Sequence, residues 1–117
     1  MLDEAEGSPF PEFLYHAAPP DIAEKIEKEG VMPGKKAMWA KLSKKGVTYW
    51  ACSPMGAALY VSMKGYKRGQ IAVYKAPLSA FDTSRLRPDS NYVHRENPAT
   101  FEYEGGIGPD KLERVDF

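Results

Sequence analysis

The stretch that decides the fold is Gly46-Val47-Thr48-Tyr49-Trp50-Ala51-Cys52-Ser53-Pro54, a strand pattern that runs directly into a helix start. Its first half is rich in β-branched and aromatic residues, which favour a β-strand. Ser53 supplies a hydroxyl for the helix N-cap, and Pro54 suits the first helical position, where an N–H would have no partner. The apolar run that follows predicts a helix that ends near Gly65.

A similar pattern precedes this junction. Phe13-Leu14-Tyr15-His16 predicts a first strand, and Pro19-Pro20 ends it. A helix is expected from Asp21 to Glu29, because apolar residues recur along one face and charged residues along the other. Gly30 is a good C-cap for that helix.

The second half of the chain adds more strands. The predicted strands cover residues 70–75, 100–104 and 113–117. Residues 77–98 are expected to be mostly loop, anchored by Phe81 and Leu86. The order strand-helix-strand-helix-strand-loop-strand-strand predicts a small α+β domain over residues 13–117, after a loosely held lead-in over residues 1–12.

Composition sets limits on function. The chain has 117 residues, of which 43% are hydrophobic, so a single packed core is feasible. Sixteen basic and sixteen acidic residues cancel, so no overall charge draws the protein to nucleic acid or membrane. No apolar run approaches the ~20 residues of a membrane helix. With Cys52 as the only cysteine, a cytoplasmic protein without a membrane partner is expected.

A histidine and two tyrosines suggest a binding pocket. His16 ends the first strand, Tyr49 lies on the second, and Tyr60 follows eleven positions later on the second helix. Taken singly, such residues are usually core or edge residues with satisfied polar groups. Their joint occurrence in this order resembles the ADP-ribosyltransferase superfamily of the His-Tyr-Glu type, in which the fold is a split β-sheet with short helices.

The resemblance covers most of the chain from residue 13 onward. Leu14-Tyr15-His16-Ala17 is similar to the strand that carries the family's first histidine, where the next residue is usually a glycine that binds the nicotinamide amide through its backbone. Gly46 to Tyr60 resembles the poly-ADP-ribose polymerase branch, in which two tyrosine rings enclose nicotinamide. The serine that this branch often has three residues before its second tyrosine is Ala57 here, and Ser53 is the substitute we consider.

The third motif of the family is a glutamate on a late strand. Phe101-Glu102-Tyr103-Glu104 offers two candidates, and a regular strand would place both carboxylates on one face. Glu102, followed by an aromatic residue, is more similar to the polymerase pattern. Glu104 is better spaced from Gly105-Gly106-Ile107-Gly108-Pro109, which resembles the family's ending. We prefer Glu102 and keep Glu104 as the alternative.

The resemblance implies an enzyme that uses NAD as a substrate. It would break the nicotinamide–ribose bond and transfer ADP-ribose to a macromolecular acceptor, either protein or nucleic acid. The expected catalytic residues are His16, Tyr49, and Glu102 or Glu104. The expected NAD-binding residues are His16, Ala17, Tyr49, Ser53 and Tyr60. The small size resembles that of stand-alone toxins and effectors.

Two alternatives stay open. The RNA 2′-phosphotransferases share the fold and use NAD, but they carry an arginine directly before the first histidine, where this chain has Tyr15. They also carry an Arg-His pair after the second helix, where this chain has Gly65-Tyr66, with Lys67-Arg68 close by. The other alternative is a non-catalytic binding module on the same fold. The departures from the family pattern at Ala17 and Ala57 are the reason to consider it.

The remaining reactive or charged residues give weaker signals. No His/Cys spacing is typical of a zinc site, so no metal is expected, and we treat Cys52 as non-catalytic. Five lysines between residues 35 and 45 surround Trp39, either as a solvated loop or as a contact to phosphate. His94-Arg95, with Arg85 and Arg87, is a second possible anion contact.

Overall fold

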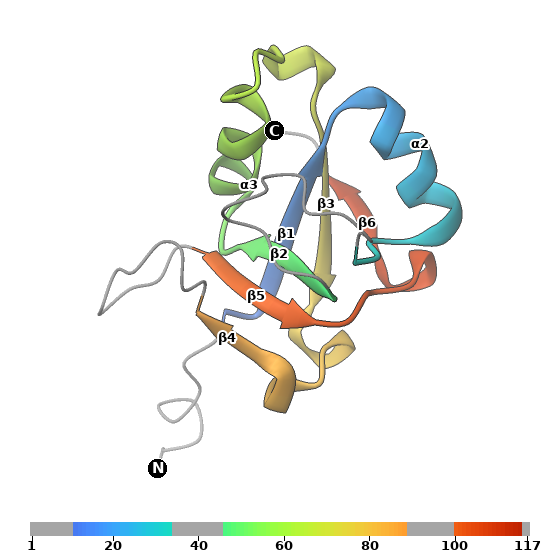
Figure 1. The fold of residues 1–117 in the computed structure, drawn as a ribbon, viewed down its shortest axis with the longest axis vertical. Coiled ribbons are helices and arrows are strands. Elements are labelled where there is room, and N and C mark those ends of the chain that lie inside the picture. The colour runs from blue at the N-terminus through green and yellow to red at the C-terminus, as the bar shows by residue number, and fades with distance from the viewer. Residues whose placement is uncertain (1–10, 34–45, 89–99, 116–117) are drawn as a thin grey trace.

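Six strands form one antiparallel sheet, and two helices cover it (Figure 1). The computed structural model describes residues 11–33, 46–88 and 100–115. The elements are β1 (Phe13–Ala18), α2 (Pro20–Glu29), β2 (Val47–Ala51), α3 (Pro54–Ser62), β3 (Ala72–Pro77), β4 (Leu86–Pro88), β5 (Thr100–Glu104) and β6 (Glu113–Val115). The strand order is β4-β5-β2-β1-β3-β6. The predicted α+β class is therefore confirmed.

The sheet separates two cores. On β1, Leu14 and Ala18 belong to a larger core that includes the buried face of α2. Tyr15 and Ala17, between them in the alternation, pack on a smaller core that includes Ala58 and Val61 of α3. Figure 1 shows α2 and α3 on opposite sides of the central pair β1 and β3. Each face of the sheet therefore has its own helix.

Aromatic side chains fill the larger core. Trp50, Phe81 and Tyr103 are buried and form two edge-to-face contacts, each with ring centroids 4.9 Å apart. Such pairs add about 0.5–1.5 kcal/mol beyond the burial of their area. Phe81 and Leu86 were expected to anchor residues 77–98, and both side chains are buried, which confirms the expectation for residues 77–88; residues 89–98 lie outside the described part of the chain. The same segment holds β4, which was expected to be loop.

The predicted helix start after β2 is confirmed. The Ser53 side chain accepts a hydrogen bond from the Gly56 N–H at 3.0 Å, and Pro54 occupies the first turn. A Cβ on Gly56 would lie 3.1 Å from the Ser53 hydroxyl oxygen, which is tight enough to disturb this cap. The cap fixes the direction in which α3 leaves β2.

Other predicted boundaries shift by a few residues. The strand expected at 70–75 begins at Ala72 and runs to Pro77, because a 3-10 turn takes up Arg68–Gln70. In that turn the Gln70 side chain accepts the Lys67 backbone N–H at 2.9 Å. The last strand is β6, which ends at Val115 instead of 117. Residues 1–10 of the expected lead-in lie outside the described residues.

The two helices have ten and nine residues. No helix within the described ranges is long and apolar enough to cross a membrane.

Helix α2 is held to the sheet by Tyr74, whose hydroxyl donates to the Glu27 carboxylate at 2.8 Å. Burial, with this hydrogen bond, raises the pKa of Tyr74 to about 12, so the phenol stays protonated at neutral pH.

The sheet is joined unevenly at its centre. β1 pairs with β3 along its whole length, and β2 pairs with β5 along its whole length. Among the described residues, Tyr15 and Ala51 are the single pair that joins β1 to β2. The two halves of the sheet therefore part beyond that pair.

The exit from α2 depends on a glycine. Gly30 caps the helix, with its N–H bonded to the Ile26 carbonyl, at φ 87° and ψ −175°. The next residue, Val31, forms a two-way backbone bridge with Ile107, at 2.9 and 2.8 Å. A Cβ on Gly30 would lie 2.2 Å from the Ile107 carbonyl oxygen. The bridge can form only because this position has no side chain.

Replacing Gly30 by alanine is expected to lower the free energy of unfolding by about 2 kcal/mol or more, because this backbone region is essentially restricted to glycine and the methyl group would clash. Urea unfolding measures the change. Gly46→Ala has a positive φ but open space around its Cβ, so it isolates the conformational cost, about 1 kcal/mol. Gly69→Ala has neither constraint and should be nearly neutral. An equal cost at Gly30 and Gly46 would contradict the close approach to Ile107.

Candidate functional site

His16 lies where the two halves of the sheet part. Its Nδ1 is 2.8 Å from the backbone carbonyl oxygen of Tyr49 on β2. A carbonyl oxygen can only accept, so Nδ1 carries the proton. In the neutral ring, Nε2 is then the acceptor nitrogen. The imidazole therefore joins β1 to β2 through one nitrogen and keeps a lone pair on the other.

The surroundings of His16 favour the neutral ring. Burial lowers the pKa of His16 most strongly; the hydrogen bond to the Tyr49 carbonyl opposes this effect, and the positive charge of Lys64 adds to it. Burial also lowers the pKa of Lys64 itself. The indole of Trp50 lies against the imidazole, with ring centroids 5.4 Å apart. We expect His16 to act at neutral pH as a hydrogen-bonding group without charge.

Tyr49 belongs to the face of β2 opposite to Trp50, because successive side chains alternate. Its cross-strand neighbour on β5 is Glu102, and the neighbour of Glu102 on β4 is Arg87. Directly opposed residues share a face of a sheet. Tyr49, Glu102 and Arg87 therefore form a row across three strands, on the side of the sheet that carries α3.

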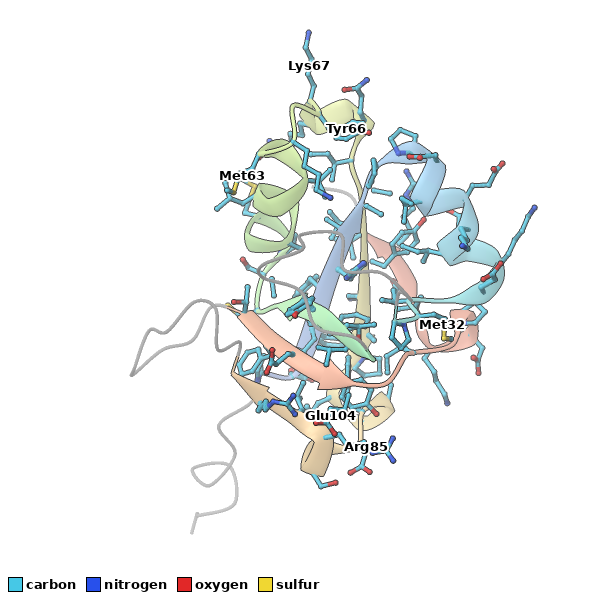
Figure 2. All side chains as sticks on the ribbon, in the orientation of Figure 1. Met32, Met63, Tyr66, Lys67, Arg85 and Glu104 are labelled. Carbon is cyan, nitrogen blue, oxygen red and sulfur yellow. The ribbon has the colours of Figure 1, made fainter. Side chains whose placement is uncertain are left out.

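Arg87 holds both candidate carboxylates. Its Nε donates to Glu102 at 2.8 Å, and its Nη1 donates to Glu104 at 2.8 Å. The two glutamates lie on one face, as their spacing predicted. They differ in burial: Glu102 is 0% exposed, whereas the Glu104 side chain is 56% exposed and lies at the β4–β5 side of the sheet (Figure 2). Glu102 is directly opposite Tyr49, whereas Glu104 is opposite Val47. Glu102 is therefore the better placed of the two glutamates for a site that includes Tyr49.

The other predicted NAD-binding residues have varied placements. Ala17 is paired with Val73 of β3, and Ala57 is buried on the inner side of α3. The Ser53 hydroxyl is occupied by the helix cap, so its use as a carboxamide contact would compete with that cap. Tyr60 lies on α3, but its side chain lies outside the described part of the structure.

Several charged residues differ from expectation or fall outside the described ranges. Arg87 was considered as an anion contact, and it pairs instead with the two glutamates. This pairing was missed because β4 has only three residues, too few for a strand pattern. The lysines of 35–45, Trp39 and His94-Arg95 lie outside the described residues. Cys52 is exposed. Within the described segments, no group of three or more His, Cys, Asp or Glu residues could hold a metal ion.

Comparison with family models and with curated proteins gives no match to this chain. The candidate site consists of a neutral histidine with one acceptor nitrogen, packed against Trp50, and of a tyrosine and a buried carboxylate on the other face of the sheet.

The tautomer of His16 can be measured directly. Long-range ¹H–¹⁵N spectra at pH 7 should show a neutral imidazole with its proton on Nδ1, and its pKa should lie below the ordinary value of about 6.5. Because the imidazole of His16 then binds a proton more tightly in the unfolded chain than in the folded one, His16 lowers the free energy of unfolding as the pH falls below about 6.5. His16→Asn should remove this contribution to the pH dependence of stability. A His94→Asn variant identifies which imidazole signals belong to the second histidine. Titration at or above 6.5, or an Nε2–H tautomer, would contradict this assignment.

The Arg87 pairing predicts an asymmetric effect on stability. Arg87→Met removes the ion-pair partner of a buried carboxylate and should cost about 2–4 kcal/mol. Glu104→Gln weakens only an exposed pair and should cost less than about 1 kcal/mol. Adding Glu102→Gln to Arg87→Met should recover part of the loss, because the buried group is then neutral. Chemical denaturation measures the free energy of unfolding of each variant. If the costs of Arg87→Met and Glu102→Gln simply add in the double variant, Arg87 does not stabilise the protein by pairing with the Glu102 carboxylate.

Proposed function

We propose that this protein binds NAD and breaks its nicotinamide–ribose bond, passing ADP-ribose to a macromolecular acceptor. One observation carries the proposal: the His16 imidazole bonds the Tyr49 carbonyl at the point where β1 and β2 part, and Glu102 stands opposite Tyr49. The three residue types that the resemblance assigns to NAD lie on three adjacent strands. The His16 imidazole packs against Trp50, whereas the Tyr49 and Glu102 side chains lie on the other face of the sheet, so in this proposal NAD would contact them across the gap between β1 and β2. We interpret the parting of β1 and β2 as the split sheet of that superfamily.

The chemistry needs little more than these groups. The bond from C1′ of the ribose to nicotinamide breaks, and its electron pair leaves with the ring nitrogen, which becomes neutral. A nucleophilic atom of the acceptor then donates a pair to C1′ and gives up its proton to solvent water. Positive charge develops on the ribose meanwhile, and a carboxylate fixed nearby stabilises it. Glu102 supplies that carboxylate in this proposal.

Binding would use the other two residues. Nε2 of His16 accepts a hydrogen bond from a ribose hydroxyl, and its neutral state leaves no positive charge to oppose the cation that forms. The Tyr49 ring offers one face for nicotinamide, and Tyr60 on α3 is expected to offer the other. A neutral imidazole and a carboxylate on the nearby strand β5 suit a reaction that creates a cationic centre.

A second candidate is a module that binds NAD without cleaving it. The observation that favours it is the pairing of Arg87 with both Glu102 and Glu104, which partly neutralises the carboxylates. This candidate and the first share the binding step and differ in turnover.

The test separates binding from turnover. Calorimetry should detect NAD binding, and Tyr60→Ala should weaken it by ~1–3 kcal/mol through lost stacking. Chromatography should detect nicotinamide release, which Glu102→Gln lowers by about 10²–10³ while NAD still binds. Glu104→Gln is the matched control and should keep both properties, and melting curves check that each variant is folded.

The outcomes are distinct. No binding of NAD at millimolar concentration would end both candidates. Binding without nicotinamide release, with protein or nucleic acid present, would leave the non-catalytic module. Equal release by the Glu102→Gln variant and the wild type would remove Glu102 from the reaction.

A further inference from the structure

The zero net charge hides a strong segregation along the chain. Residues 30–81 contain no aspartate or glutamate, so all sixteen acidic residues lie outside this segment. The cations of the segment are Lys35, Lys36, Lys41, Lys44, Lys45, Lys64, Lys67, Arg68 and Lys75. Its described part forms β2, α3, the 3-10 turn Arg68–Gln70 and β3. Helix α3 and the turn that follows it therefore contain cations and no acidic residue; the carboxylates of Glu102 and Glu104 on the same side of the sheet belong to β5 and are paired with Arg87.

Helix α3 presents apolar side chains to solvent. Met55, Leu59 and Met63 are 63%, 60% and 64% exposed. Their four-residue spacing places them on one ridge of the helix and its C-cap. The opposite side of α3 is buried on the sheet, and the helix has no charged residue from Pro54 to Ser62. A surface helix normally carries charged residues on its outer face, so this ridge is typical of an interaction site.

Cations lie at one end of the ridge. Figure 2 shows Met63 on α3, with Tyr66 and Lys67 beyond the C-terminal end of the helix. Lys67 and Arg68 are exposed. We call Met55, Leu59, Met63 and Lys67 the α3 surface: an apolar ridge with a basic end.

We propose that the α3 surface binds an amphipathic helix of another protein, with its apolar face across Leu59 and an acidic end facing Lys67. A ridge of residues four apart packs into the groove of a second helix. The absence of acidic residues from 30–81 means that the acidic end meets no like charge in that segment. Charge and shape therefore favour the same partner.

Other occupants fit this surface less well. A helix that lies on a membrane carries lysine or arginine along its length, whereas the cations here are gathered at one end of α3. Phosphates of a nucleic acid would face three apolar side chains. In a two-fold pairing with a second copy, the Lys67 end would face the start of the other α3, which has no carboxylate. The proposal does not depend on NAD chemistry, because the ridge faces away from the sheet.

A displayed library of random helix-forming 16-residue peptides provides the probe. Selection on the intact protein should enrich peptides with apolar residues at helical spacing and acidic residues gathered at one end. Leu59→Ser should weaken the selected peptides about tenfold or more, and Lys67→Glu by several-fold. Met32→Ser is the matched control, since Met32 is an exposed methionine outside α3, and it should change nothing.

The methionines report where the peptide binds. With ¹³C-methyl methionine, a selected peptide should shift the Met55 and Met63 signals and leave Met32 in place. The proposal is wrong if selected peptides bind the Leu59→Ser variant as tightly as wild type, or lack the acidic end. It is also wrong if Leu59→Ser abolishes binding to phosphatidylglycerol vesicles, dissolves a dimer in sedimentation, or if poly(U) shifts the Met55 and Met63 signals.

Discussion

The hydrogen bond from the His16 imidazole to the Tyr49 carbonyl is the contact on which the centre of this molecule depends. In the described part of the chain, strand pairing joins β1 to β2 at one residue pair, and the His16 side chain continues the connection beyond that pair. The same bond selects the tautomer and leaves an acceptor nitrogen at the gap. One contact thus serves both the sheet and the chemistry we propose for it.

The second constraint is the burial of Glu102 in the interior of a sheet. A buried carboxylate is costly unless it is paired, and Arg87 provides the pair from a strand of three residues. Glu104 binds the other end of the same guanidinium and so holds it in place. The short edge strand β4 therefore supplies Arg87, the cation that stabilises the buried Glu102 carboxylate beside Tyr49.

Local signals made much of the fold predictable. Ser53, Pro54 and Gly30 act on neighbours within one helical turn, so their roles follow from sequence alone. The alternation over 100–104 gave β5 its bounds and placed both glutamates on one face. By contrast, β4 is too short for a pattern, and the pairing of Arg87 depends on the register between strands that are distant along the chain. The bond of His16 to Tyr49 depends on where two strands part, which no local pattern encodes.

The strand order also has a consequence for how the chain folds. β2 is synthesised early, yet its full-length partner is β5, which lies about fifty residues later, while its pairing with β1 is a single position. Pairing between distant segments is slow, because the loop must close before any contact compensates for the lost entropy. Until β5 inserts between β4 and β2, the Tyr49 strand has an open edge. Because Glu102 lies on β5, its carboxylate stands beside Tyr49 only when this long-range pairing has formed.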